Sequence, residues 1–160
     1  MLFWYVGVSV VAVHDIFRSQ GLDYRLIAVG ALLPLILDLP FGRFAYAHSL
    51  LAGVALLCVV LLATIGRSRL TRRRIICLPI GYFCGLVLSG AFLHDVSFMW
   101  PLLGSDFPAD SLFPPATVLV LMEAAGIAII VWAWGRFGLS NAERRARFLR
   151  TGRLTEVHAR

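Results

Sequence analysis

Long apolar stretches, separated by short polar links, make up most of the chain. They are Leu2–Phe17, Leu26–Phe41, Phe44–Ile65, Ile75–Leu93 and Ala116–Trp134. A helix rises about 1.5 Å per residue and the hydrocarbon core of a bilayer is about 30 Å thick, so about 20 apolar residues make one crossing. The last three stretches meet or approach that length. The pattern predicts an all-α fold: a polytopic transmembrane helical bundle with about five membrane segments.

The first two stretches are short for a full crossing, and Pro34 interrupts the second. Two arrangements are compatible with this length. Either each segment crosses the bilayer with its flanking residues reaching the interface, or the two together form a re-entrant hairpin.

Residues 137–160 are polar and basic, and we expect them to form a tail beyond a transmembrane domain of residues 1–136. Ser140 is followed three positions later by Glu143, which is a capping-box pattern. The tail is therefore predicted to form a short amphipathic helix on the membrane surface, with Phe148 and Leu149 directed toward the lipid.

Composition agrees with a membrane protein. Apolar residues make up 59% of the chain, and its mean hydropathy is +0.82; soluble domains are normally about half apolar. The net charge of +6 comes from fifteen arginines and no lysine. Two segments hold most of them, one after the third apolar stretch (Arg67, Arg69, Arg72, Arg73 and Arg74) and one in the tail (Arg144, Arg145 and Arg147).

These arginines predict the orientation of the chain and its partners. Cytoplasmic loops of membrane proteins carry an excess of Lys and Arg, so both basic segments are predicted to be cytoplasmic and the N-terminus external. The expected partners are the lipid bilayer and anionic lipid head groups, with a protein partner or a second copy of the chain as alternatives. Nucleic acid is disfavoured because the charges directly flank hydrophobic segments.

Ionisable side chains at the ends of the apolar stretches are candidates for chemistry, since charge near the hydrocarbon is costly. In the predicted topology Asp38, His48, His94 and Asp95 all lie at the outer face. Imidazole nitrogen and carboxylate oxygen are ligands for a divalent metal such as zinc, which activates bound water for hydrolysis. The alternative interpretation is that these residues cap helix ends and contact water.

Glu123 lies deeper, within the fifth stretch. A carboxyl at that depth is either protonated or paired. It is interpreted as an interhelical hydrogen-bonding group, with a catalytic role as the alternative.

Several short motifs resemble the bacterial membrane-bound metal-dependent hydrolase family, and more closely an actinobacterial branch of it. They are Gly30–Asp38, His48-Ser49, Gly81–Gly90 and Trp100-Pro101-Leu102, in that order. The family carries a Pro-Asp pair with a second Asp three residues on, then His-Ser, then a His and an Asp four residues apart. Asp38 and His48 match this pattern, whereas Leu35, Gly85 and Ser89 stand in place of the other three. The resemblance implies a multi-pass protein of the bacterial inner membrane.

Two functions follow from the resemblance. The first is a metal-dependent hydrolase that acts on a lipid-linked or envelope substrate, with zinc or manganese held by Asp38, His48, His94 and Asp95. The second is a pseudoenzyme, a non-catalytic membrane scaffold or partner subunit that uses its arginine-rich cytoplasmic face. A small transporter is a third reading that Glu123 and Pro34 keep open, although the chain lacks the two related halves typical of that class.

Overall fold

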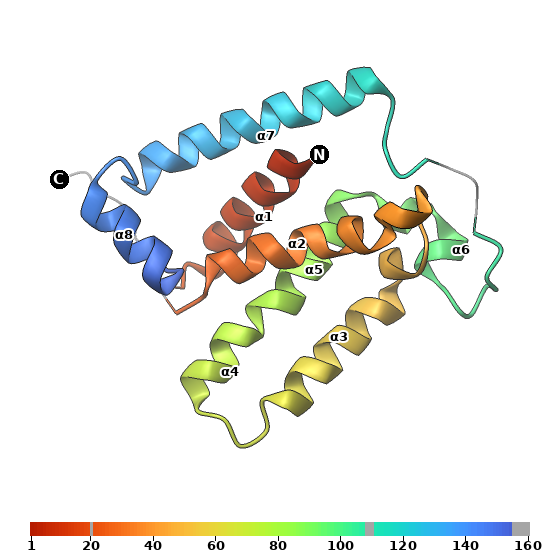
Figure 1. Cartoon of the computed structure of the whole chain (residues 1–160), viewed down its shortest axis with the longest axis horizontal. Helices are drawn as coiled ribbons and strands as arrows, with labels where there is room; N and C mark the ends of the chain where they lie inside the picture. Colours follow the sequence, from red (N-terminus) through yellow and green to blue (C-terminus); the bar gives the residue numbers. More distant parts are fainter. Residues whose placement is uncertain (20, 108–110, 155–160) are drawn as a thin grey trace.

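The computed structural model describes residues 1–19, 21–107 and 111–154, which fold into helices and connecting loops (Figure 1). The helices are α1 (Leu2–Phe17), α2 (Tyr24–Asp38), η1 (Leu39–Phe41), η2 (Tyr46–His48), α3 (Leu50–Ala63), α4 (Arg69–Ile75), α5 (Cys77–Leu88), η3 (Ala91–Leu93), α6 (Asp95–Phe98), α7 (Ala116–Arg136) and α8 (Ala142–Thr151). No strand is formed among the described residues. The prediction of an all-α fold is confirmed.

Helices α2 and α5 form the centre of the bundle and run parallel to each other. Gly81 packs on Ile27 and Gly85 on Ala31, so closely that a Cβ at either glycine would overlap a carbonyl oxygen of α2. Residue numbers therefore increase in the same direction along both helices. Small residues allow this close backbone contact between helices in membranes.

Helices α1 and α7 form a second parallel pair. A Cβ at Gly126 would overlap the backbone at the start of α1, and a Cβ at Gly7 would lie 3.0 Å from the carbonyl oxygen of Gly126. Near the other end of both helices, Arg136 and Asp15 form an ion pair of 2.8 Å.

The bundle has two chemically different ends. At one end α2 ends and α3 begins, and we call this the Asp38 end. At the other lie the link from α1 to α2, helix α4 and helix α8, and we call this the arginine end (Figure 1).

Two helices are shorter than the apolar stretches that predicted them. Residues 44–49 form a loop that contains the short 3-10 helix η2, and α3 begins only at Leu50, where the side chain of Ser49 caps the helix. Helix α5 ends at Leu88 because Gly90, with a φ of 70°, turns the chain there. The third and fourth stretches therefore each include residues that lie in loops at the Asp38 end.

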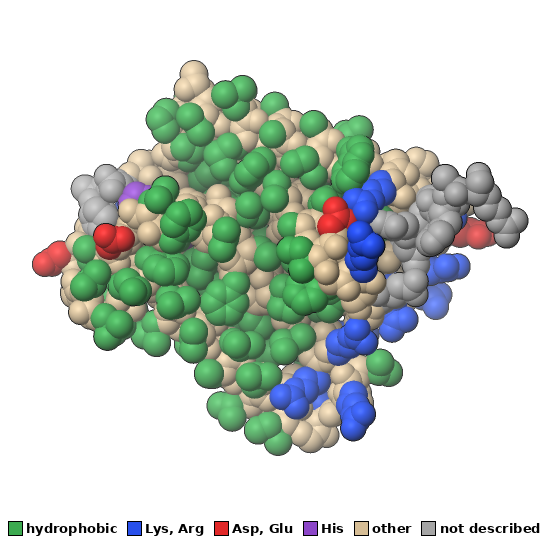
Figure 2. Space-filling model, turned by 180° about the vertical axis from the view of Figure 1, so that it is seen from behind, with side chains coloured by type: hydrophobic (Ala, Val, Ile, Leu, Met, Phe, Trp, Pro, Cys, Tyr) green, Lys and Arg blue, Asp and Glu red, His purple; other side chains and the backbone are tan. Residues whose placement is uncertain are grey.

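Large apolar side chains remain exposed along α3 and α7. Val59 and Leu62 of α3 are 61% and 67% exposed, and Leu121 and Val131 of α7 are 69% and 66% exposed. Figure 2 shows an apolar surface across the middle of one face, with arginines gathered at one end. A domain in water rarely exposes so large an apolar surface.

Within the described residues, two helical segments are long and apolar enough to cross a bilayer, Tyr24–Phe41 and Ala116–Arg136. Leu2–Phe17 and Leu50–Ala63 are shorter apolar helices. The structure thus supports part of the predicted membrane arrangement.

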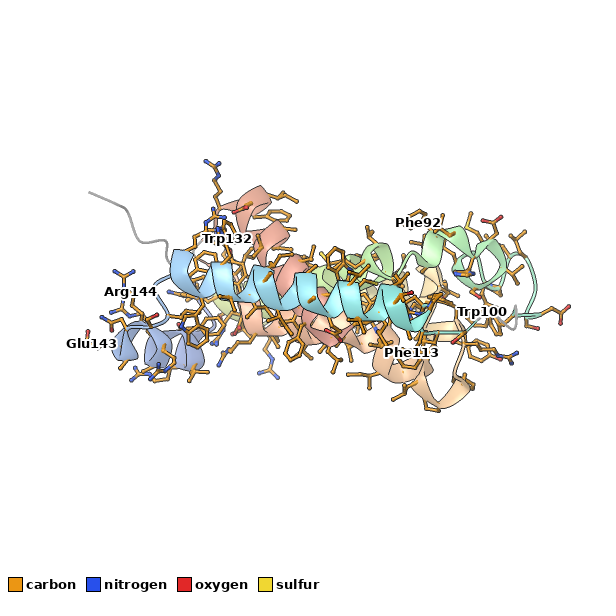
Figure 3. The ribbon with its side chains drawn as sticks, turned by 90° about the horizontal axis from the view of Figure 1, so that it is seen from above. Phe92, Trp100, Phe113, Trp132, Glu143 and Arg144 are labelled. Atoms are coloured by element: carbon orange, nitrogen blue, oxygen red, sulfur yellow. The ribbon has the colours of Figure 1, made fainter. Side chains whose placement is uncertain are left out.

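Aromatic side chains lie toward both ends of this apolar surface. Phe92, Trp100 and Phe113 lie toward the Asp38 end, whereas Trp132 lies toward the arginine end, where Arg144 is also found (Figure 3). Aromatic residues concentrate in this way at the two interfaces of a bilayer.

Candidate functional site

Asp38 and His48, two of the predicted metal ligands, meet in the loop that joins α2 to α3. The carboxylate of Asp38 accepts hydrogen bonds from the backbone N–H groups of Ala45 (2.9 Å), Ala47 (3.0 Å) and His48 (3.1 Å). Nδ1 of His48 lies 2.7 Å from the same carboxylate. Both side chains are 1% exposed. A buried carboxylate needs such partners. Because these donors all lie in the segment after α2, the carboxylate of Asp38 fixes the conformation of that loop.

Two further side chains hold this loop in place. The hydroxyl of Tyr82, on α5, donates to the carbonyl of Ala47. The hydroxyl of Ser97, on α6, donates to the carbonyl of Phe44 at 3.0 Å. Neither residue was predicted, because the sequence does not reveal which carbonyl a hydroxyl will bind, whether it lies in an apolar stretch, as Tyr82 does, or in a polar link, as Ser97 does.

His94 and Asp95 occupy different positions around the same loop. The ring of His94 stacks on Phe44 with centroids 4.3 Å apart, and the ring of His48 meets Phe44 edge-on at 4.8 Å. Asp95 is exposed at the first position of α6. Over the described ranges, no three His, Cys, Asp or Glu side chains are arranged so that they could hold a metal ion. The structure joins Asp38 to His48 but does not gather all four predicted ligands.

Within the part of the chain that the structure describes, the surroundings of Asp38 do not supply the three protein ligands and open position of a catalytic zinc ion. Hydrogen-bond donors already occupy the carboxylate of Asp38. Because Nδ1 of His48 faces that carboxylate, Nε2 is the ring nitrogen left for a metal. Asp38 and His48 together therefore leave one imidazole nitrogen for a metal, whereas a catalytic zinc site needs three protein ligands.

Two of the three positions where the resembled family carries further ligands are closed by packing. Leu35 is buried in an apolar cluster, and Gly85 packs directly on the backbone of Ala31, which leaves no room for a side chain. The hydroxyl of Ser89 donates to the carbonyl of Leu86 at 2.9 Å, within its own helix turn. Packing therefore leaves no room for a ligand at positions 35 and 85, while the half-buried hydroxyl of Ser89 is engaged within its own helix.

A pocket of about 350 Å³ opens beside this cluster. Its lining is mainly apolar and aromatic: Leu33, Leu37, Asp38, Phe41, Tyr46, Ala47, Ala52, Leu56, Tyr82 and Trp100. Since the carboxylate of Asp38 is directed at the loop, this pocket presents an apolar surface.

Glu123 of α7 contacts the start of α1. Its carboxylate accepts hydrogen bonds from the N–H groups of Leu2 (2.7 Å) and Phe3 (2.9 Å) and from the amino group of Met1. The first N–H groups of a helix have no partner within it, and Glu123 provides one. Its role in the structure is an interhelical cap.

Asp23 is the centre of a second polar cluster, at the arginine end. This buried residue accepts hydrogen bonds from Nε and Nη2 of Arg25 (3.1 and 2.9 Å) and from Nη2 of Arg74 (3.2 Å). Burial raises the pKa of Asp23, but the hydrogen bonds from Arg25 and Arg74 outweigh burial, and its pKa lies below the ordinary value. Asp23 therefore stays charged and fixes two guanidinium groups side by side.

The predicted basic residues all lie at this end. Arg67 is in the loop before α4, Arg69, Arg72, Arg73 and Arg74 are on α4, and Arg144, Arg145 and Arg147 are on α8. All of them except the half-buried Arg144 are exposed. Their grouping makes the arginine end strongly positive (Figure 2).

Helix α8 is docked on the bundle. The N–H of Tyr24 donates to the carbonyl of Gly152 (2.9 Å), and Nη1 of Arg25 donates to the carbonyl of Leu149 (2.6 Å). Phe148 packs against the buried cluster at this end, whereas Leu149 is 63% exposed. Phe148 thus contacts protein in place of the lipid that the sequence pattern predicted.

Comparison with known protein families, characterised proteins and solved structures gives no match. The function is therefore argued from the two polar clusters and the apolar surface between them.

Proposed function

We propose that this chain is a multi-pass protein of the bacterial cytoplasmic membrane that has lost metal chemistry. It acts as a non-catalytic scaffold whose arginine-rich cytoplasmic end binds anionic head groups. The observation that carries the proposal is the carboxylate of Asp38, which accepts three backbone hydrogen bonds from its own loop and pairs with His48, whereas a hydrolase of the resembled type would use it as a ligand. Here it serves to fold the α2–α3 loop.

Three features support five membrane segments, with Ile75–Leu93, which contains α5, as the fourth. Apolar side chains are exposed along α3 and α7. The polar links alternate between the Asp38 end and the arginine end along the chain. Two helical segments have the length of a full crossing. With the arginine end in the cytoplasm, the arrangement obeys the positive-inside rule and puts the N-terminus outside.

The metal content of the purified protein tests whether metal-dependent chemistry has been lost. Detergent-purified protein, produced in medium supplemented with zinc and manganese, is measured by elemental analysis beside a His48→Ala, His94→Ala double variant. We expect neither metal at a stoichiometric level in either protein. About one metal ion per chain in the parent, absent from the double variant, would overturn the proposal and restore the hydrolase reading.

A transporter has less support. The carboxylate of Glu123, the deepest in the predicted spans, is engaged by the start of α1, and Pro34 is buried within a continuous α2. Neither residue therefore presents a broken helix or an unsatisfied charge, which are the usual signs of a transport site.

A further inference from the structure

A depression of about 510 Å³ lies between the first turns of α2 and helix α4, at the arginine end. Arg25, Thr71 and Arg74 provide its polar part, with Asp23 behind them. Leu26, Val29 and Ile75 provide its apolar part. The two parts meet in one site.

The polar part is preorganised. Asp23 holds Arg25 at 2.9 Å and Arg74 at 3.2 Å, while its own side chain is 3% exposed. The side chains of Arg25 and Arg74 are 36% and 48% exposed, so they reach solvent. One carboxylate balances one guanidinium, and the pair keeps a net positive charge. Arginines fixed in advance bind an anion at a smaller entropic cost.

The apolar part points to an amphiphilic ligand. Val29 lies one turn beyond Arg25 along α2 and is 50% exposed. In the proposed orientation this turn enters the hydrocarbon region, while Arg25 remains at head-group depth. A soluble anion would use the arginines alone, whereas a lipid would use both parts.

We propose that this depression binds one phospholipid with an anionic head group. Its phosphate is held by Arg25 and Arg74, with the Thr71 hydroxyl, now paired with Ser68 at 2.9 Å, beside them. Its glycerol and first acyl carbons lie on Leu26, Val29 and Ile75. Arg25 already donates from Nε and Nη2 to Asp23 and from Nη1 to Leu149, so the phosphate is bound by the remaining N–H groups of the two charged guanidinium groups. Basic pockets between membrane helices recognise such head groups. The inference rests on the membrane location in the proposed function, but not on the loss of metal.

Native mass spectrometry of the full chain in detergent tests the site, with dioleoyl phosphatidylglycerol and dioleoyl phosphatidylcholine as probes. The parent is expected to retain one phosphatidylglycerol in preference to phosphatidylcholine. An Arg25→Gln, Arg74→Gln double variant is expected to bind it at least about tenfold more weakly, because two charge-assisted contacts are lost. The matched control is Arg69→Gln, Arg72→Gln, which removes the same charge from exposed positions outside the depression. These arginines contribute only to the diffuse attraction of the arginine end, so the control is expected to weaken retention of the lipid much less than the Arg25→Gln, Arg74→Gln variant does.

A second variant separates loss of binding from misfolding. Val29→Trp fills the depression while leaving Asp23, Arg25 and Arg74 in place, and it is also expected to lose the bound lipid. Equal weakening in both arginine double variants would overturn the proposal in favour of diffuse attraction. Displacement of the lipid by glycerol phosphate at the same concentration would overturn it in favour of a soluble anion. The readout does not involve metal or orientation, so its failure is distinguishable from failure of the proposed function.

Discussion

Removing the carboxylate of Asp38 should unfold the loop that it organises. Asp38→Ala leaves three backbone N–H groups and the His48 imidazole without their acceptor. Each lost hydrogen bond costs about 1 kcal/mol, so the free energy of unfolding should fall by about 3 to 4 kcal/mol. Asp38→Asn keeps one acceptor oxygen but turns an NH₂ group toward a backbone donor, and it should cost about half as much.

A thiol-reactive fluorescent dye measures this effect during heating in detergent. Cys77 is buried and Cys84 is half-buried, so they react as the bundle opens, whereas exposed Cys58 is replaced by Ser to remove the background. For a chain of this size about 1 kcal/mol corresponds to about 2 to 4 °C. Asp38→Ala should therefore unfold about 6 to 16 °C below the parent.

Asp95→Asn is the matched control, because Asp95 belongs to the same predicted metal set but is exposed. Its unfolding temperature should change by less than about 2 °C. If Asp38→Ala unfolds at the same temperature as this control, Asp38 does not support the loop, and our argument against a metal ligand there is refuted.

Three further predictions concern the rest of the molecule. Gly85→His, which restores the residue of the resembled family, should destabilise the protein by more than about 2 kcal/mol through overlap with Ala31; a stable variant that binds zinc would contradict this. In intact cells, an impermeant thiol reagent should label Ser105→Cys but not Ser68→Cys in a cysteine-free background, and the reverse pattern would invert the proposed orientation. Asp23 has a lowered pKa, so its stabilising effect is complete above its ordinary pKa near 4 and is lost as the pH falls through the folded-state value. Asp23→Asn should therefore be less stable than the parent at pH 7, with the difference shrinking below about pH 4 in tryptophan-monitored unfolding; a constant difference would count against this role.

The sequence pattern predicted the helices better than it predicted the loops. A long apolar run leaves few alternatives to a helix, and α1 and α7 were placed almost to the residue. Residues 44–49 were assigned to a helix because they are nearly as apolar as α3. The loop forms because backbone N–H groups bind Asp38. Every residue except proline carries such a group, so the amino-acid sequence does not show which residues will donate.

The candidate sites differ in the same way. Asp38 and His48 were selected by residue type, and they do meet, in a hydrogen-bonded pair that holds the loop between α2 and α3. Asp23 was passed over within a polar link, although an Asp just before an apolar helix is a recognisable N-cap. Its contact with Arg74 joins residues 51 positions apart. Residues so far apart in the sequence meet only because α2 packs on α5, and the sequence does not show that packing.

The parallel pairing of α2 with α5 also sets an order of events while the chain is being made. Cys77, at the start of α5, accepts a hydrogen bond from the N–H of Asp23, 54 residues earlier. At a synthesis rate of about 5 to 20 residues per second, Cys77 is made about 3 to 11 s after Asp23. During that time α2 is present without α5, its main packing partner. The donors to Asp38 follow it by only 7 to 10 residues. The donors that stabilise the carboxylate at the end of α2 are therefore synthesised long before the helix against which α2 finally packs.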